Sequence, residues 1–368
     1  MPIYMDRHIV PGIEAKHAAE AHREDLKIQH EYGCRCMTYW VDEGRGCAFC
    51  LIDAPDKEAV IKMHDRAHGL IPHDIIQVNS NVVEAFLGRI DDPAGYFDGD
   101  DPDLKVINDP AFRIIVVFKV ENVILLKHSL GVEKTNQLYS LYTRIVRKQV
   151  QDHEGREVRA EGQGSIISFV SVTQAVKFAL AVRSSLHVAG ELLKLKIAIH
   201  GGMPVSKSKE IFGETVKMAN YLCRIGPDSQ IQMASIIGEI FKDDGQSDTF
   251  GAKQFNWIHA IDENIIELLF DTLADHYQDS EFDLDAFCRE MSMSQSNLYR
   301  KTVAFTGLSP NFLLREFRLI ESLGFLEKER SIAQAAYSSG FNNPSYFTKC
   351  FQKRFGIRPL TFVKLLDQ

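Results

Sequence analysis

The sequence lacks any apolar run near the ~20 residues that a membrane-spanning helix needs. Its first 17 residues carry charges where a secretion signal needs an apolar core, so no signal peptide is predicted. Low-complexity stretches are missing as well. These absences favour a cytoplasmic protein made of globular domains. Its 368 residues suffice for two or three domains of about 100–200 residues each.

Cysteine is too scarce and too unevenly placed for a disulfide scaffold. Four of the seven cysteines lie within 17 residues, at positions 34, 36, 47 and 50, and the count is odd. A disulfide framework spreads its cysteines along the chain, and a reducing cytosol keeps them as thiols. The cluster therefore indicates a metal or redox site.

Positive charge is also in deficit, because 42 Lys and Arg face 50 Asp and Glu, a net charge of −8. The deficit is uneven along the chain. Residues 291–368 hold 11 Lys and Arg against 5 Asp and Glu, a net +6, so the first 290 residues carry −14. A basic end on an acidic body favours a protein whose nucleic-acid surface is confined to one domain.

The order of apolar patterns predicts a multidomain α+β protein that ends in an all-α domain. Residues 1–88 read as βαββαβ, the ferredoxin-like arrangement, with the last strand over 75–86. Residues 89–110 hold seven Asp and three Pro and predict an acidic linker. Residues 111–242 predict an α/β sandwich with a hairpin at 158–170. A connector (243–262) and a helical domain (263–368) follow.

The basic end contains two copies of one helix-turn-helix pattern, in residues 284–307 and 332–356. Ser294 is placed to cap a helix in the first copy, and Asn343 with Pro344 is placed to cap and start one in the second. Two such helices about 34 Å apart reach adjacent major grooves on one face of a duplex. A bundle that only packs needs neither capped turn, so the pattern predicts double-stranded DNA as a partner.

Polar side chains on these two helices are the expected DNA contacts. Asn and Gln can pair bidentately with adenine and Arg with guanine, while Lys, Ser and Thr hold phosphates. The expected contacts are Gln295, Ser296, Asn297, Arg300, Lys301, Asn343, Ser345, Tyr346, Thr348, Lys349 and Lys353. Tyr299, Phe347 and Phe351 are expected in the core. Arg318 fits either a helix ion pair or a phosphate contact.

The run MSQSNLYRKTVAFTGLSP followed by REFRL, together with SIAQAAYSSGFNNPSYFTKCFQKRFGIRP, resembles the AraC-type transcription regulators over about 100 residues. The resemblance implies that residues 294–305 and 344–355 are the DNA-reading helices. Ala335 and Ser339 stand where the family usually has larger aliphatic side chains. A slightly looser second unit is therefore expected.

Residues 112–235 resemble the catalytic domain of class III nucleotide cyclases through VVFKVEN, VRAEGQGSIISF, LKIAIHGG and IFGETVKMANYLCRIG. Such enzymes hold paired metal ions with two aspartates. The resemblance places the metal positions on Lys119 and Gln163 and the transition-state positions on Lys217 and Tyr221. An ammonium and a neutral amide do not suit Mg²⁺, so we expect no catalytic residues. The domain is then either a dimerisation spacer or a cleft that binds a small ligand without chemistry.

The N-terminal domain gathers thiols and imidazoles, which together suit Ni, Zn or Cu rather than Mg or Ca. MDRHIVPG and CRCMTYWVDEGRGCAFCLIDAPDKEAVIKMHDRAHGLIPHDIIQV resemble small bacterial ferredoxin-like proteins, some of which bind nickel. The resemblance implies a transition-metal site, for Ni²⁺ or for another such ion, for example Zn²⁺. Cys50 and His64 are the first candidate ligands and Cys36 and His8 the next. The spacing lacks a zinc-finger frame, and a histidine on a helix is often only solvated.

These patterns together predict a homodimeric one-component transcription regulator that senses a metal or a small molecule. Two alternatives stay open. The chain could be a metal-dependent nucleotide cyclase with a regulatory tail, if Glu121 or Glu161 serves as a ligand. It could instead be a nickel buffer whose helical tail is incidental. The operator, the regulated genes and the direction of regulation do not follow from the sequence.

Overall fold

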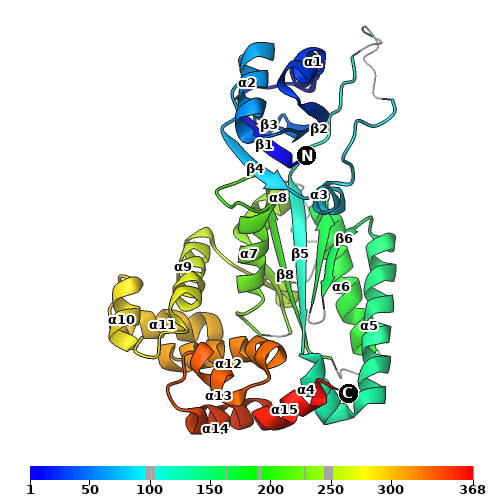
Figure 1. The fold of residues 1–368 in the computed structure, drawn as a ribbon. Coiled ribbons are helices and arrows are strands. Elements are labelled where there is room, and N and C mark those ends of the chain that lie inside the picture. Colours follow the sequence, from blue (N-terminus) through cyan, green and yellow to red (C-terminus); the bar gives the residue numbers. More distant parts are fainter. Residues whose placement is uncertain are drawn as a thin grey trace.

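The structure, a computed structural model, describes residues 1–95, 101, 104–161, 164–188, 193–227, 229–243 and 252–367. Figure 1 shows the N-terminal domain at one end, a central sheet domain and the helical C-terminal domain at the other end. Across the described ranges, no helix combines the length and the apolar character needed to cross a membrane. The architecture confirms the predicted multidomain fold class.

The N-terminal domain is an antiparallel sheet in the order β2-β3-β1-β4, as the βαββαβ prediction requires. Its elements are β1 (Ile3–Ile9), α1 (Ala15–Ile28), β2 (Arg35–Asp42), β3 (Cys47–Asp53), α2 (Lys57–Ala67), β4 (Asp74–Val78) and α3 (Ser80–Leu87). The predicted last strand over 75–86 was too long. Asn79 accepts a hydrogen bond from the backbone of Asn81 and starts α3, so the polar cap ends the strand.

The two faces of this sheet have different partners. Side chains of one face, including Tyr39 and Ala48, pack under α1, and Tyr4 and Ile52 pack under α2. Alternate side chains, including Trp40, belong to the large core that continues into the middle domain. Because side chains alternate along each strand, every strand contacts the helices with one face and the middle domain with the other.

The segment predicted as an acidic linker is largely packed where it is described. Leu104 and Ile107 are 1% and 2% exposed. The hydroxyl of Tyr39 donates to Lys105 O and accepts from Ile107 N, each at 2.8 Å. Arg89 pairs with Asp109 and lies over a tryptophan ring. Two buried aliphatic side chains therefore anchor the segment that its acidic composition had predicted to be an exposed linker.

The middle domain is a six-stranded sheet in the order β10-β9-β8-β5-β7-β6. Its elements are β5 (Arg113–Val120), α4 (Val123–Leu130), α5 (Val132–Asp152), β6 (Arg156–Glu161), β7 (Gly164–Phe169), α6 (Val172–Val188), β8 (Leu195–Gly202), α7 (Gly213–Leu222), β9 (Ile231–Met233), α8 (Ser235–Asp243) and β10 (Phe255–Trp257). β10 pairs in parallel with β9. Part of the predicted 243–262 connector therefore completes the sheet, which the sequence analysis missed because the strand has only three residues.

The C-terminal domain contains both predicted helix-turn-helix units. Its helices are α9 (Ala260–His276), α10 (Leu284–Glu290), α11 (Gln295–Thr306), α12 (Pro310–Glu329), α13 (Ile332–Ser338), α14 (Pro344–Phe355) and α15 (Pro359–Leu365). The side chains of Ser294, Ser331 and Asn343 cap α11, α13 and α14. The turn before α11 has Ser292 at φ 51°.

Polar contacts fix each outer domain to the middle one. At the N-terminal junction, Arg113 donates to Phe86 O and Leu87 O at 3.3 and 3.2 Å. At the C-terminal junction, Arg224 donates to Glu321 at 3.0 Å. Ile124 of α4 is part of the apolar core of the second helix-turn-helix unit. β5 runs between the two junctions (Figure 1).

Candidate metal centre and nucleic-acid interface

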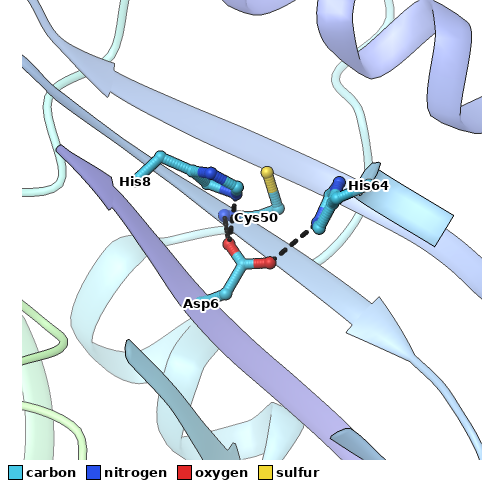
Figure 2. Close-up of side chains that lie close together, drawn as sticks. All are labelled: Asp6, His8, Cys50 and His64. Carbon is cyan, nitrogen blue, oxygen red and sulfur yellow. Dashed lines mark hydrogen bonds and ion pairs between the residues drawn. The ribbon is translucent and has the colours of Figure 1, made fainter. Parts of the chain in front are cut away.

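Four side chains with metal-binding atoms meet under α2. Asp6 and His8 alternate on β1 and so point to the same face, and Cys50 lies on the neighbouring strand β3. His64 reaches them from α2 (Figure 2). One ligand atom from each residue lies within 4.8 Å of those of the other three.

Asp6 is the centre of this group. Its Oδ2 lies 2.9 Å from His64 Nε2, and its Oδ1 lies 3.4 Å from His8 Nε2. The backbone N–H of Cys50 donates to Oδ1 at 2.9 Å. Asp6 is 1% exposed and His64 is fully buried. Burying a carboxylate between two imidazoles is costly, and a core that only stabilises the fold does not require such a group.

The donor set fits a transition-metal ion. Among the described residues, Nδ1 of His8 is buried and has no hydrogen-bond partner. A buried polar atom without a partner is costly, and a metal ion would satisfy it. One carboxylate, two imidazoles and one thiol are donors suited to Ni, Zn or Co rather than to Mg or Ca. The residues present therefore fit the ion that the sequence predicted.

Burial and ion pairing shift the pKa values of the group. Burial alone would lower the pKa of His64, but hydrogen bonds to Asp25 and Asp6 outweigh it and raise the pKa to about 10. Burial would raise the pKa of Asp6, yet the charge of His8 and the hydrogen bond from His64 hold it well below its usual range. Burial raises the pKa of the Cys50 thiol well above its ordinary value.

A second group adjoins the first on the other side of His64. His64 Nδ1 lies 3.0 Å from Asp25 Oδ1 and 3.1 Å from His68 Nε2. His68 Nε2 also lies 3.3 Å from Asp25 Oδ1. Asp25 belongs to α1, and His68 follows the last turn of α2. The two ring nitrogens of His64 thus face two different sets of side chains.

The structure brings together three of the four predicted ligands, His8, Cys50 and His64. Within the described part of the chain, Cys36 is not in this group, since its thiol lies 3.7 Å from the sulfur of Met63 in an apolar cluster. The bulge between Cys36 and Thr38 changes the strand register there. Asp6 and Asp25 were missed. The spacing of Asp6 and His8 on one strand was the available signal for Asp6.

The first predicted reading helix, α11, presents a polar surface. Gln295, Ser296 and Arg300 are exposed and Asn297 is half-buried. Arg300 donates to the side chain of Asn297 at 3.0 Å, so the two side chains lie side by side. Tyr299 was expected in the core but is 55% exposed, because the core side of the helix is taken by other residues, and it adds an aromatic group to this surface.

The second reading helix, α14, exposes Ser345, Tyr346, Lys349 and Lys353. Phe347 and Phe351 are fully buried, as expected, and hold the helix on the core of its unit. Packed in this way, the helix leaves its polar face exposed to solvent.

Several expected contacts have other partners within the chain, and the side-chain amide of Gln295 donates to Asp285 at 2.8 Å. Lys301 is half-buried and pairs with Asp262 of α9 at 2.9 Å. The side chain of Asn343 accepts the N–H of Tyr346, and the hydroxyl of Thr348 donates to Pro344 O. Arg318, left open between two roles, donates to Tyr277 O and Asp279 O, so it joins α12 to the end of α9.

Two positions that the cyclase resemblance assigned to catalysis hold the C-terminal domain. Lys217 lies 2.8 Å from Glu267 and 3.2 Å from Asp271, both on α9. Tyr221 donates to Asp271 at 2.7 Å. Lys119 is half-buried, and burial together with Arg224 lowers its pKa to about 8. Gln163 and the side chain of Glu161 lie outside the described residues.

Two known families match separate parts of the chain. The nickel responsive protein SCO4226-like family matches residues 4–78, and the helix-turn-helix domain family matches residues 287–364. The HTH-type transcriptional activator RhaS of Escherichia coli is 33% identical over 95 residues, 26% of this chain and 34% of RhaS. The chain spans about a third or less of the length of the curated relatives it matches.

Two solved structures are also similar to parts of the chain. SCO4226 from Streptomyces coelicolor A3(2) is 31% identical with a TM-score of 0.20, over 21% of this chain and 94% of SCO4226. An adenylate/guanylate cyclase/hydrolase from Silicibacter pomeroyi is 19% identical with a TM-score of 0.31, over 36% of this chain and 81% of that one. The predicted resemblances of the two outer domains are thus confirmed: residues 4–78 match the SCO4226-like family, and residues 287–364 match a helix-turn-helix family to which the RhaS similarity also points.

Proposed function

We propose that the chain is a one-component transcription regulator in which a transition-metal ion, nickel first, changes how the C-terminal domain binds promoter DNA. One observation carries the proposal. A single chain joins a buried donor set, in a domain similar to a nickel responsive protein, to a helix-turn-helix domain with two polar reading helices.

The proposed ligands of the ion are Asp6, His8, Cys50 and His64. A bound divalent ion would supply positive charge to a buried site that already holds carboxylates. Asp25 accepts from Nδ1 of His64 and would keep that ring turned so that Nε2 faces the ion. Carboxylates behind ligand histidines commonly serve this purpose, and losing one typically lowers metal affinity about 10–100-fold.

The contacts between domains can transmit a conformational change from the metal site to the DNA-binding domain. Asp6 and His8 alternate along β1 with residues of the opposite sheet face, and Met5 on that face belongs to the core shared with the middle domain. β5 then connects the N-terminal junction to the C-terminal one. A ligand that binds one arrangement of these packed domains better than another shifts the population toward it.

We propose that the middle domain transmits this change without catalysis. Lys217 and Tyr221 are engaged with α9, which supports a structural use for those positions. An assay with ATP or GTP and Mn²⁺ tests this directly. Turnover that is lost on changing Glu121 would favour the cyclase alternative instead.

A homodimer is part of the proposal, and the same contacts restrict its interface. The face of α7 that carries Lys217 and Tyr221 is covered by α9 of the same chain, so a second chain would need another surface. Sedimentation of the full chain with and without Ni²⁺ measures the assembly state.

Genome-wide footprinting with and without added nickel tests the regulator as a whole. Selected fragments are then titrated by fluorescence anisotropy at several salt concentrations, because phosphate contacts make affinity salt-dependent. His64→Ala should remove the nickel effect, and His17→Ala, an exposed histidine on α1, should keep it. Nickel uptake without sequence-selective, salt-dependent DNA binding would favour the buffer alternative.

A further inference from the structure

Asp25, His64 and His68 form a second group of potential metal ligands whose ligand atoms lie within 4.8 Å of one another. His64 belongs to both groups. Its Nε2 faces Asp6 at 2.9 Å, and its Nδ1 faces Asp25 at 3.0 Å and His68 at 3.1 Å. A single imidazole ring thus separates two clusters of donor atoms.

We propose that the N-terminal domain holds two divalent transition-metal ions, with the ring of His64 bridging them. This inference rests on the proposed function, because the first ion lies in the group of Asp6. The second ion would take Asp25, His64 Nδ1 and His68 Nε2. Three protein ligands and one water form a common arrangement for such ions. The side chain of His68 is 11% exposed and is the least buried of the three ligands, so a water would complete the set on its side.

One contact makes the second position the weaker of the two. The backbone N–H of Leu70 donates to Nδ1 of His68 at 3.2 Å, which places the proton of a neutral His68 on Nε2. An ion on Nε2 requires that proton to move to Nδ1, so the Leu70 contact must open. The second ion therefore binds after the first and shifts the chain that follows α2.

The experiment counts ions on the full chain by native mass spectrometry during titration with Ni²⁺, and repeats the titration with Co²⁺ for electron paramagnetic resonance. Wild type should reach two ions per chain, and an imidazole-bridged Co²⁺ pair should show magnetic coupling. His68→Ala should stop at one ion and show uncoupled Co²⁺. His68→Gln is the second variant should the first fail to fold, and His17→Ala is the matched control.

The outcomes separate this inference from the proposed function. A wild-type chain that saturates at one ion, or a second ion that survives both His68 variants, overturns the bridged pair and leaves the single-ion sensor standing. A chain that binds no ion overturns both. Two coupled ions without any effect on DNA binding would support the bridge while contradicting the regulator.

Discussion

The two ends of the molecule organise their functional groups in opposite ways. At the C-terminal end, each reading helix is set by residues within a few positions of one another, such as Ser294 with Asn297 and Asn343 with Tyr346. At the N-terminal end, His64 meets Asp6 across 58 positions and Asp25 across 39. The first kind of site is determined by residues that are close in sequence. The second kind forms only when the sheet and its helices have folded together. The predictions below test that contrast.

The largest effect is expected from removing the residue at the centre of the long-range site. His64→Ala leaves Asp6 and Asp25 buried without their shared partner, so the ion-free protein should lose about 3–5 kcal/mol of stability in the N-terminal domain. Urea unfolding followed by Trp40 fluorescence in a Trp257→Phe background measures it, because the chain has two tryptophans. His17→Ala should change the midpoint little. Equal midpoints for all three proteins would mean that the ion pairs around His64 contribute nothing.

The next largest effect is expected at the C-terminal end, on the affinity for DNA. Arg300→Ala and Asn297→Ala should each cost about 1–3 kcal/mol in binding to a selected operator and relax specificity at one base. Anisotropy titrations against the operator and single-base variants measure both quantities. Lys328→Ala, an exposed lysine near the end of α12, is the control. Wild-type affinity in both variants would show that α11 does not read the duplex.

The affinity for nickel should depend on pH, because the ion competes with a proton for His64. The hydrogen bonds from Asp25 and Asp6 raise the pKa of His64 from 6.5 to about 10, so the ion must displace a proton from His64 at any pH below that value. Affinity should therefore rise about tenfold per pH unit between about pH 6.5 and 8.5 for each proton released. Competition with a chromophoric chelator measures the slope. A flat profile would show that His64 does not bind the ion.

The same pKa shift has a stability consequence of known sign. A histidine whose folded pKa is raised stabilises the protein fully below its unfolded pKa near 6.5, and that contribution is lost as the pH rises toward about 10. Unfolding of the ion-free protein at about pH 7 and pH 9.5 compares the two conditions. His64→Ala should lack this loss of stability.

The smallest effect tests a single local contact. Ser294→Ala removes the side chain that caps α11 and should cost about 1 kcal/mol of stability. Ser294→Gly should cost only a few tenths, which makes it the matched control. Thermal unfolding of the full chain detects the difference, and a long-range metal site should be unaffected. A change in nickel affinity would mean that the two ends are coupled even without DNA.

The sequence predicted the helix-turn-helix domain closely because caps, turns and apolar spacing are local signals. It predicted the order of strands in the N-terminal domain for the same reason. It failed where tertiary contacts decide the structure. Cys36 lies at a β-bulge and its thiol contacts Met63. The three-residue strand that begins at Phe255 completes the middle sheet, although its segment was predicted to be a connector. Asp25 gave no sequence signal as a ligand, because its neighbours on α1 look like those of any amphipathic helix.

The depth of the donor group around Asp6 has a consequence for timing. Asp6, His8 and His64 are 0–5% exposed and Cys50 is half-buried, so an ion held by all four would exchange with solvent mainly during local openings of the packed helix α2, which are rare events. We therefore expect an ion held there to enter and leave slowly. A site of this kind would follow the average supply of metal over long periods and would not respond to brief fluctuations.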